Sequence, residues 1–251
     1  MSLWHVTAAA KMTDFMKSYF PAAEVSFTGS FLNPETLDIY SDVDMKVSPV
    51  GGGRVNLKAF VGAMSVRVYG VFGYETHINA DSDVLRVCFD NGWRFDITLE
   101  YGTPQARESG GALADNIDSV INQFWFLSSM VLVKLGRGDY LIAAHLALEL
   151  CRLVIVIQML VRDGETKTDI HRFGGFEEVP ALKALATWGE RRDNSQNTGE
   201  DILNILFLAA ECMDMTAAAN RPDYTARTGK LRLMRLHFSN MDCHAVFNGS
   251  Q

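Results

Sequence analysis

The chain has 251 residues, 48% of them hydrophobic, and carries a formal net charge of -7 at pH 7. This length is sufficient for one large domain or for two smaller domains that each bury a hydrophobic core. The acidic charge argues against a protein that binds nucleic acid without sequence preference, because such binding depends on basic patches that neutralise phosphates.

The first segment predicts a helix followed by two strands. Apolar residues recur at helical spacing from Val6 to about Phe20, and Pro21 ends the pattern. Glu24 to Thr28 then predicts a short strand, and Gly29-Ser30 predicts a turn. Asp42 to Val47 predicts a second strand, which the following Ser-Pro dipeptide is expected to close.

A β-hairpin is predicted farther along the chain. The arms are Val84 to Phe89 and Trp93 to Leu99, and Asn91-Gly92 between them supplies the positive φ angles that a tight turn needs. Side chains alternate between the two faces of a strand. The second arm therefore has an apolar face with Phe95, Ile97 and Leu99 and a polar face with Arg94, Asp96 and Thr98.

After the hairpin the composition changes. Residues 101–111 are rich in glycine, serine and charge, which predicts a linker and a boundary between domains 1–110 and 111–251. The rest of the chain predicts a helical bundle with helices over Ile117 to Leu135, Asp139 to Val161, Pro180 to Trp188 and Asp201 to Ala217. The basic tail from Asn220 predicts a solvated helix or an edge. The predicted fold class is α+β, a small mixed sheet with flanking helices followed by a helical bundle.

The location in the cell is predicted from what the sequence lacks. The four cysteines form no Cys-x-x-Cys pair, which favours free thiols in a reducing compartment. The first residues show no secretory signal, and the most apolar segment, Leu141 to Val161, is interrupted by charged residues. A cytoplasmic protein without membrane association is expected.

Two aspartates in the second strand predict a metal site. Asp42 and Asp44 are spaced i, i+2, so in a strand their carboxylates share one face. Like charges this close raise each other's pKa, and a cation between them relieves the repulsion. Hard oxygen ligands favour Mg²⁺, which binds through one or two carboxylates together with substrate phosphates.

The neighbouring motifs extend this site. The Gly29-Ser30 turn lets nucleotide phosphates approach the backbone closely. If Asp96 lies on the same face as Asp42 and Asp44, the three acids form a two-metal site. One ion then activates the attacking oxygen and the other stabilises the leaving pyrophosphate. Asp96 would serve both as a metal ligand and as the general base nearest the acceptor hydroxyl.

This pattern resembles a known superfamily. Gly29-Ser30, then Asp42-x-Asp44, then a later strand acid resembles the signature of the DNA polymerase β-like nucleotidyltransferases. The run from Asn91 to Leu99 resembles the third-acid strand of the aminoglycoside 6-adenylyltransferase (streptomycin adenylyltransferase) family. The segment from Phe124 to Lys134 is similar to the second domain of that family, so the resemblance covers most of residues 5 to about 215.

The resemblance implies a reaction and a role for each motif residue. It implies magnesium-dependent transfer of a nucleoside monophosphate, AMP from ATP, to a hydroxyl of a small molecule of the aminoglycoside or lincosamide type, with release of pyrophosphate. By motif position Gly29 and Ser30 would hold phosphates, Lys134 would reach the triphosphate, Asp42, Asp44 and Asp96 would bind metal, and Asp96 would be the base. The expected partners are the nucleotide and the acceptor, without nucleic acid or membrane, and a homodimer is left open.

Simpler interpretations of single residues stay open. Asp42 and Asp44 are also the residues expected on a strand face that is turned to solvent. Asp96 is also placed to form an ion pair with Arg94 on the same face. Lys134 also suits a lysine that extends from the end of an apolar helix to water. Glu149 is expected to pair with Arg152 three residues on, and the aromatic residues Phe124, Trp125 and Phe126 are expected in the core.

Two other functions stay open. The same fold could transfer AMP to a protein or a metabolite, because the fold gives the reaction class and not the acceptor. The chain could also be a nucleotide-binding module without catalysis. A module that has lost its catalytic activity has usually lost one of the metal-binding acids, and all three candidate acids are present here.

Overall fold

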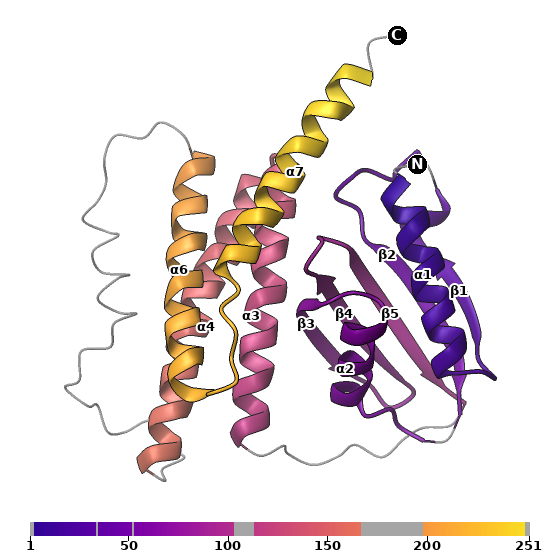
Figure 1. Ribbon diagram of the computed structural model, residues 1–251, viewed down its shortest axis with the longest axis horizontal. Coiled ribbons are helices and arrows are strands. Elements are labelled where there is room, and N and C mark those ends of the chain that lie inside the picture. The colour runs from indigo at the N-terminus through magenta and orange to yellow at the C-terminus, as the bar shows by residue number, and fades with distance from the viewer. Residues whose placement is uncertain (1–2, 34, 52, 103–112, 167–197, 249–251) are drawn as a thin grey trace. The chain divides into compact units, whose positions relative to one another are not determined.

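The computed structural model describes residues 3–33, 35–51, 53–102, 113–166 and 198–248. The fold is α+β, with a five-stranded mixed sheet, flanking helices and a helical C-terminal region (Figure 1), as the sequence predicts. The chain divides into two compact units, one over residues 1–110 with 241–251 and one over residues 111–240. The predicted helix over 180–188 and most of the predicted linker lie outside the described residues.

The chain begins with a helix and two strands, α1 (Leu3–Tyr19), β1 (Glu24–Thr28) and β2 (Val43–Val50). The predicted Gly-Ser turn is the start of a 3-10 helix, η1 (Gly29–Leu32). β2 continues past the predicted stop at Pro49, because the pairing of β1 with β2 ends at Ser48 and the missing N–H of Pro49 costs no bond in that ladder.

Two elements were not predicted from the sequence. Helix α2 (Leu57–Arg67) begins at Asn56, whose side chain accepts a hydrogen bond from the N–H of Ala59 at 3.0 Å. Strand β3 (Val71–Ile78) follows it. The predicted hairpin is confirmed as β4 (Ser82–Phe89) and β5 (Arg94–Tyr101), and Gly92 in its turn has a φ of 84°.

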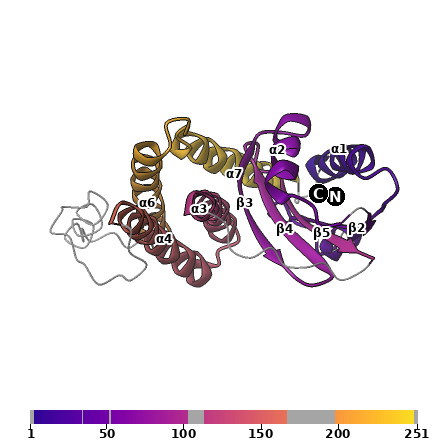
Figure 2. The same ribbon diagram turned by 90° about the horizontal axis from the view of Figure 1, so that it is seen from below.

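The sheet has the strand order β1-β2-β5-β4-β3. The β2–β5 pair is parallel and the other pairs are antiparallel. Helices α1 and α2 lie on one face of the sheet (Figure 2). Their apolar side chains pack there against those of the strands, among them Met12, Phe60, Met45, Leu85 and Ile97, all at most 1% exposed. The opposite face carries the polar residues of β2, β4 and β5.

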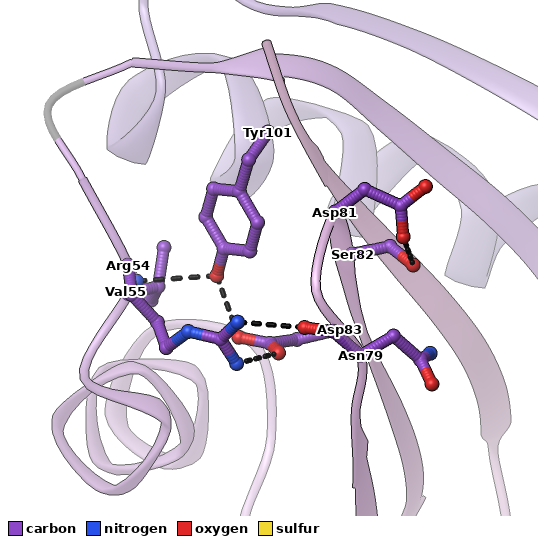
Figure 3. Close-up of polar contacts among 7 residues, drawn as sticks. All are labelled: Arg54, Val55, Asn79, Asp81, Ser82, Asp83 and Tyr101. Carbon is purple, nitrogen blue, oxygen red and sulfur yellow. Dashed lines mark hydrogen bonds and ion pairs between the residues drawn. The ribbon is translucent and has the colours of Figure 1, made fainter. Parts of the chain in front are cut away.

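A buried polar cluster lies at the edge of the sheet where β5 ends (Figure 3). The carboxylate of Asp83 is fully buried and accepts hydrogen bonds from Arg54 Nη1 and from the hydroxyl of Tyr101, each at 2.6 Å. Burial and the bond to Asp83 raise the pKa of Tyr101 to about 12. Tyr101 in turn accepts a hydrogen bond from the N–H of Val55. The cluster therefore ties the segment before α2 to the sheet.

The second unit is helical. It contains α3 (Leu113–Gly136), α4 (Tyr140–Thr166), α6 (Thr198–Asn220) and the first part of α7 (Thr228–Asn248), up to residue 240. α3 and α6 cover the predicted helices over 117–135 and 201–217, and α4 covers the one over 139–161 except its first residue. α4 packs against both α3 and α6. Phe124, Trp125 and Phe126 are buried, as predicted. The basic tail forms α7, which buries Leu231 and is therefore amphipathic rather than fully solvated.

Two of these helices have the dimensions of a membrane span. Tyr140–Arg162 and Thr198–Asn220 are long and apolar enough by length and composition, with 33% and 61% of their most apolar windows buried. Core helices of soluble proteins pass the same test, so this is weak evidence for a membrane.

Candidate active site

The polar face of the sheet carries one row of side chains across all five strands. Thr28 is the register partner of Asp44, Asp44 of Asp96, Asp96 of Arg86, and Arg86 of Glu75. Residues paired in this way point to the same face and have neighbouring Cβ atoms. The row therefore brings together two of the predicted acids, Asp44 and Asp96, from strands that are far apart in the sequence.

Gly29 lies directly against the carboxylate of Asp44. Its φ of +64° is in the left-handed region, which favours glycine. A Cβ atom at this position would lie 2.0 Å from Asp44 Oδ2, which is far closer than atoms can approach. The predicted close approach at Gly29 is therefore an approach to an acid of the candidate site, and Ser30 follows it in η1.

The third predicted acid, Asp42, lies outside the strand. β2 begins at Val43, so the prediction that Asp42 and Asp44 alternate within one strand is wrong. The preceding carbonyl of Ser41 bonds to His5 Nε2 at 3.1 Å and to Arg94 Nη2 at 3.3 Å instead of joining the sheet ladder. Asp42 still lies close enough for its charge to raise the pKa of both Asp44 and Asp96.

The cation that contacts Asp96 is Arg86 of the neighbouring strand. Arg86 Nε donates to Asp96 Oδ2 at 2.9 Å, and Arg86 Nη1 donates to Glu75 Oε1 at 3.2 Å. Arg94, the ion-pair partner considered from the sequence, is 2% exposed and donates to the carbonyls of Gly92, Tyr40 and Ser41. Sequence reasoning missed Arg86 and Glu75 because both lie on other strands.

The environment makes the two strand acids harder to ionise. Burial and the charge of Asp42 raise the pKa of Asp96 to about 6, with a smaller contribution from Asp44 and an opposing one from Arg86. The pKa of Asp44 is also raised, first by burial and then by Asp42. Carboxylates held together in this way are stabilised by a cation between them.

The donor set has the chemistry that a divalent metal prefers, but not the arrangement that would hold one. Asp42, Asp44 and Asp96 offer hard carboxylate oxygens that repel one another, and the backbone of Gly29 packs against Asp44. In the part of the chain that the structure describes, no group of three or more His, Cys, Asp or Glu side chains is arranged to hold a metal ion. Arg86 donates to Oδ2 of Asp96, so a metal ion bound to this carboxylate would lie close to the guanidinium.

Lys134, the predicted triphosphate ligand, belongs to the helical unit. It lies in the last turn of α3, and its Nζ is 3.9 Å from Asp139 Oδ2. Its role toward a nucleotide stays a prediction. The predicted pair of Glu149 and Arg152 is confirmed, because Arg152 Nε donates to Glu149 Oε2 at 2.7 Å.

Comparison with known proteins identifies no family. No protein-family model matches the chain, and no curated protein matches it. Among solved structures, the chain is similar to the polymerase core of TRAMP, an RNA surveillance complex, with a TM-score of 0.31 and 13% sequence identity. The similarity covers 82% of this chain and 56% of that chain, so this chain spans little more than half of its length.

Proposed function

We propose that this chain is a magnesium-dependent nucleotidyltransferase. It would transfer a nucleoside monophosphate, AMP from ATP, to a hydroxyl of a small molecule and release pyrophosphate. The observation that carries the proposal is the pairing of Asp44 with Asp96 across parallel strands, with Gly29 packed against Asp44. Two partly buried acids beside a glycine whose added Cβ would displace the Asp44 carboxylate suit a site for metal and phosphate.

Each residue of the proposed site has its own role in this reaction. Asp42, Asp44 and Asp96 would hold Mg²⁺, and the bound metal would neutralise charge on the phosphates. Gly29 and Ser30 would receive the triphosphate through their backbone, and Lys134 would add a positive charge. The acceptor oxygen forms a bond to the α-phosphorus while the bond from that phosphorus to the bridging oxygen breaks. The hydroxyl proton passes to Asp96.

Asp96 is suited to the role of base. In the metal-free protein burial and the charge of Asp42 raise its pKa to about 6, which makes it more basic than an ordinary aspartate. Bound Mg²⁺ would favour its ionised form, which is the form that accepts a proton. For the acceptor we propose a cationic antibiotic of the aminoglycoside or lincosamide type, in keeping with the net charge of -7. We place the reaction in the cytoplasm.

The test is pyrophosphate release from ATP and Mg²⁺ across a panel of aminoglycosides and lincosamides. We expect release that depends on one acceptor and that falls by at least about a hundredfold in Asp96→Asn, because general base catalysis contributes that much or more. Glu100→Gln is the matched control, since Glu100 lies on the same strand with its side chain 36% exposed and paired to Lys46. This variant should keep its activity.

Other outcomes discriminate between the alternatives. ATP binding in calorimetry without release across the panel would refute the antibiotic acceptor and leave a protein or a metabolite as the acceptor. ATP binding with no transfer to any acceptor, including proteins of a cell extract, would indicate a nucleotide-binding module. Absence of both ATP and metal binding would contradict the proposed function.

A further inference from the structure

We propose that Arg86 is a positioning residue. Its guanidinium is bonded to Asp96 while no metal is bound, and it moves to Glu75 when Asp96 binds a divalent cation. This inference rests on the proposed function only in that Asp96 takes a metal. It assigns roles to two residues, Arg86 and Glu75, that belong to none of the sequence motifs.

The contacts show that Arg86 already spans both positions. Its Nε donates to Asp96 Oδ2 at 2.9 Å, and its Nη1 donates to Glu75 Oε1 at 3.2 Å. Different N–H groups make the two contacts, so one bond can be given up while the other is kept. Glu75 can also receive a second bond from the guanidinium, because a carboxylate accepts the planar fork of arginine through both oxygens.

The strand register sets the direction of the movement. Asp44, Asp96, Arg86 and Glu75 follow one another on neighbouring strands. Glu75 therefore lies on the side of Arg86 away from Asp44. A divalent cation shared by Asp44 and Asp96 repels the guanidinium, and the repulsion drives Arg86 toward Glu75.

Burial distinguishes the fixed groups from the mobile group. The side chains of Glu75 and Asp96 are 14% and 20% exposed, whereas that of Arg86 is 45% exposed. A long, partly solvated arginine changes rotamer at little cost, while the two acids on the strands stay in place. Glu75 also faces His77, whose Nε2 is 3.6 Å from Glu75 Oε1.

Arg86 also limits the repulsion in the metal-free protein. Without Arg86, the carboxylates of Asp96 and Glu75 would lose the guanidinium that contacts both of them. The repulsion of Asp96 by Asp42 and Asp44 would then be less well balanced. The ion pair with Asp96 therefore competes directly with a metal for the same carboxylate. Removing Arg86 should strengthen metal binding, whereas the loss of a residue that only supports the structure should weaken it.

The test measures the affinity for Mn²⁺ alone, by electron paramagnetic resonance of the free ion and by calorimetry. We expect Arg86→Gln to bind Mn²⁺ about threefold to tenfold more tightly than the unmodified protein, which is the effect of removing one partly exposed ion pair. Glu75→Gln should bind more weakly, because Arg86 then has only Asp96 as its carboxylate partner in the row. Arg86→Lys keeps the positive charge but loses the planar fork that contacts both Asp96 and Glu75, so its Mn²⁺ affinity should lie between those of the unmodified protein and Arg86→Gln.

The controls separate this inference from the proposed function. Asp96→Asn should lose most of the Mn²⁺ affinity, and urea unfolding without metal confirms that each variant is folded. If Asp96→Asn loses the affinity but Arg86→Gln binds no more tightly than the unmodified protein, the role of Arg86 is refuted and the metal site stands. If the unmodified protein binds no Mn²⁺, or Asp96→Asn binds it equally well, the proposed function fails and this inference fails with it.

Discussion

Gly29 shows how the lack of a side chain shapes the site. The carboxylate of Asp44 occupies the space that a Cβ atom on this residue would need. The left-handed φ angle is a separate requirement, which other glycines of the chain share. The steric demand and the conformational demand can therefore be measured independently.

Gly29→Ala should impair the site more than it impairs the fold. Positive φ alone costs an alanine about 1 to 2 kcal/mol, and the clash with Asp44 Oδ2 should in addition displace that carboxylate and lower Mn²⁺ affinity by at least about tenfold. Gly138→Ala is the matched control, because Gly138 has a φ of +72° with open space around it. Equal metal affinity in the two variants would refute the contact as the cause.

Asp96 gives the metal-free protein a specific dependence on pH. Its pKa in the folded chain, about 6, lies above the ordinary value of 3.8. Between these values the folded state keeps a proton that the unfolded state releases, so the free energy of unfolding decreases as pH rises through this window. The loss persists at higher pH.

Asp96→Asn should remove this dependence. We expect the variant to be about 1 to 2 kcal/mol more stable than the unmodified protein at pH 8 without metal, since a shift of one pKa unit corresponds to about 1.4 kcal/mol. The measurement is urea unfolding in a chelator from pH 4.5 to 8. Parallel stability curves for the two proteins would contradict the raised pKa of Asp96.

At the scale of elements, the segment before β2 is held from two sides. Arg94 of β5 donates to the carbonyls of Tyr40 and Ser41 at 2.6 and 3.3 Å, and His5 of α1 reaches the same Ser41 carbonyl. Asp42 follows at once, so these contacts fix where the third acid stands.

Arg94→Met should therefore weaken both the fold and the site. We expect a loss of about 2 to 4 kcal/mol in the free energy of unfolding, because buried hydrogen bonds to a charged group are lost, together with lower Mn²⁺ affinity. Urea unfolding and calorimetry measure the two effects. Arg152→Met removes an exposed ion pair on α4 and should change stability by less than about 0.5 kcal/mol. Comparable losses in the two variants would refute the anchoring role.

The elements that the sequence predicts well have strong local signals. The alternation of β5 and the Asn91-Gly92 turn predict the hairpin, and the same turn places Arg86 opposite Asp96, so this partner could have been found from the register. β3 carries a weaker pattern because it is an edge strand with Gly73 within it. α2 buries Phe60, Val61 and Met64 at helical spacing, which is a usable signal, but Gly62 interrupts it.

At the scale of the whole molecule, the two periodicities of the sequence predict the α+β class. The site is harder to predict, since Asp44 and Asp96 meet through a parallel pairing that no local pattern specifies. The position of Asp42 outside β2 could not be predicted either, because it depends on hydrogen bonds that His5 and Arg94 make to the carbonyl of Ser41. Lys134 belongs to the helical unit, and its role toward a nucleotide stays a prediction.

The strand order also has a consequence for how the protein is made. β1 pairs with β2, and β3, β4 and β5 pair in succession, so both groups form from contacts that are local in the sequence. Only the β2–β5 pairing joins them, and it must close a long loop, which is slow. The two acids lie on this seam. We therefore expect a chain still on the ribosome to remain without a metal site until β5 has emerged and the seam has closed.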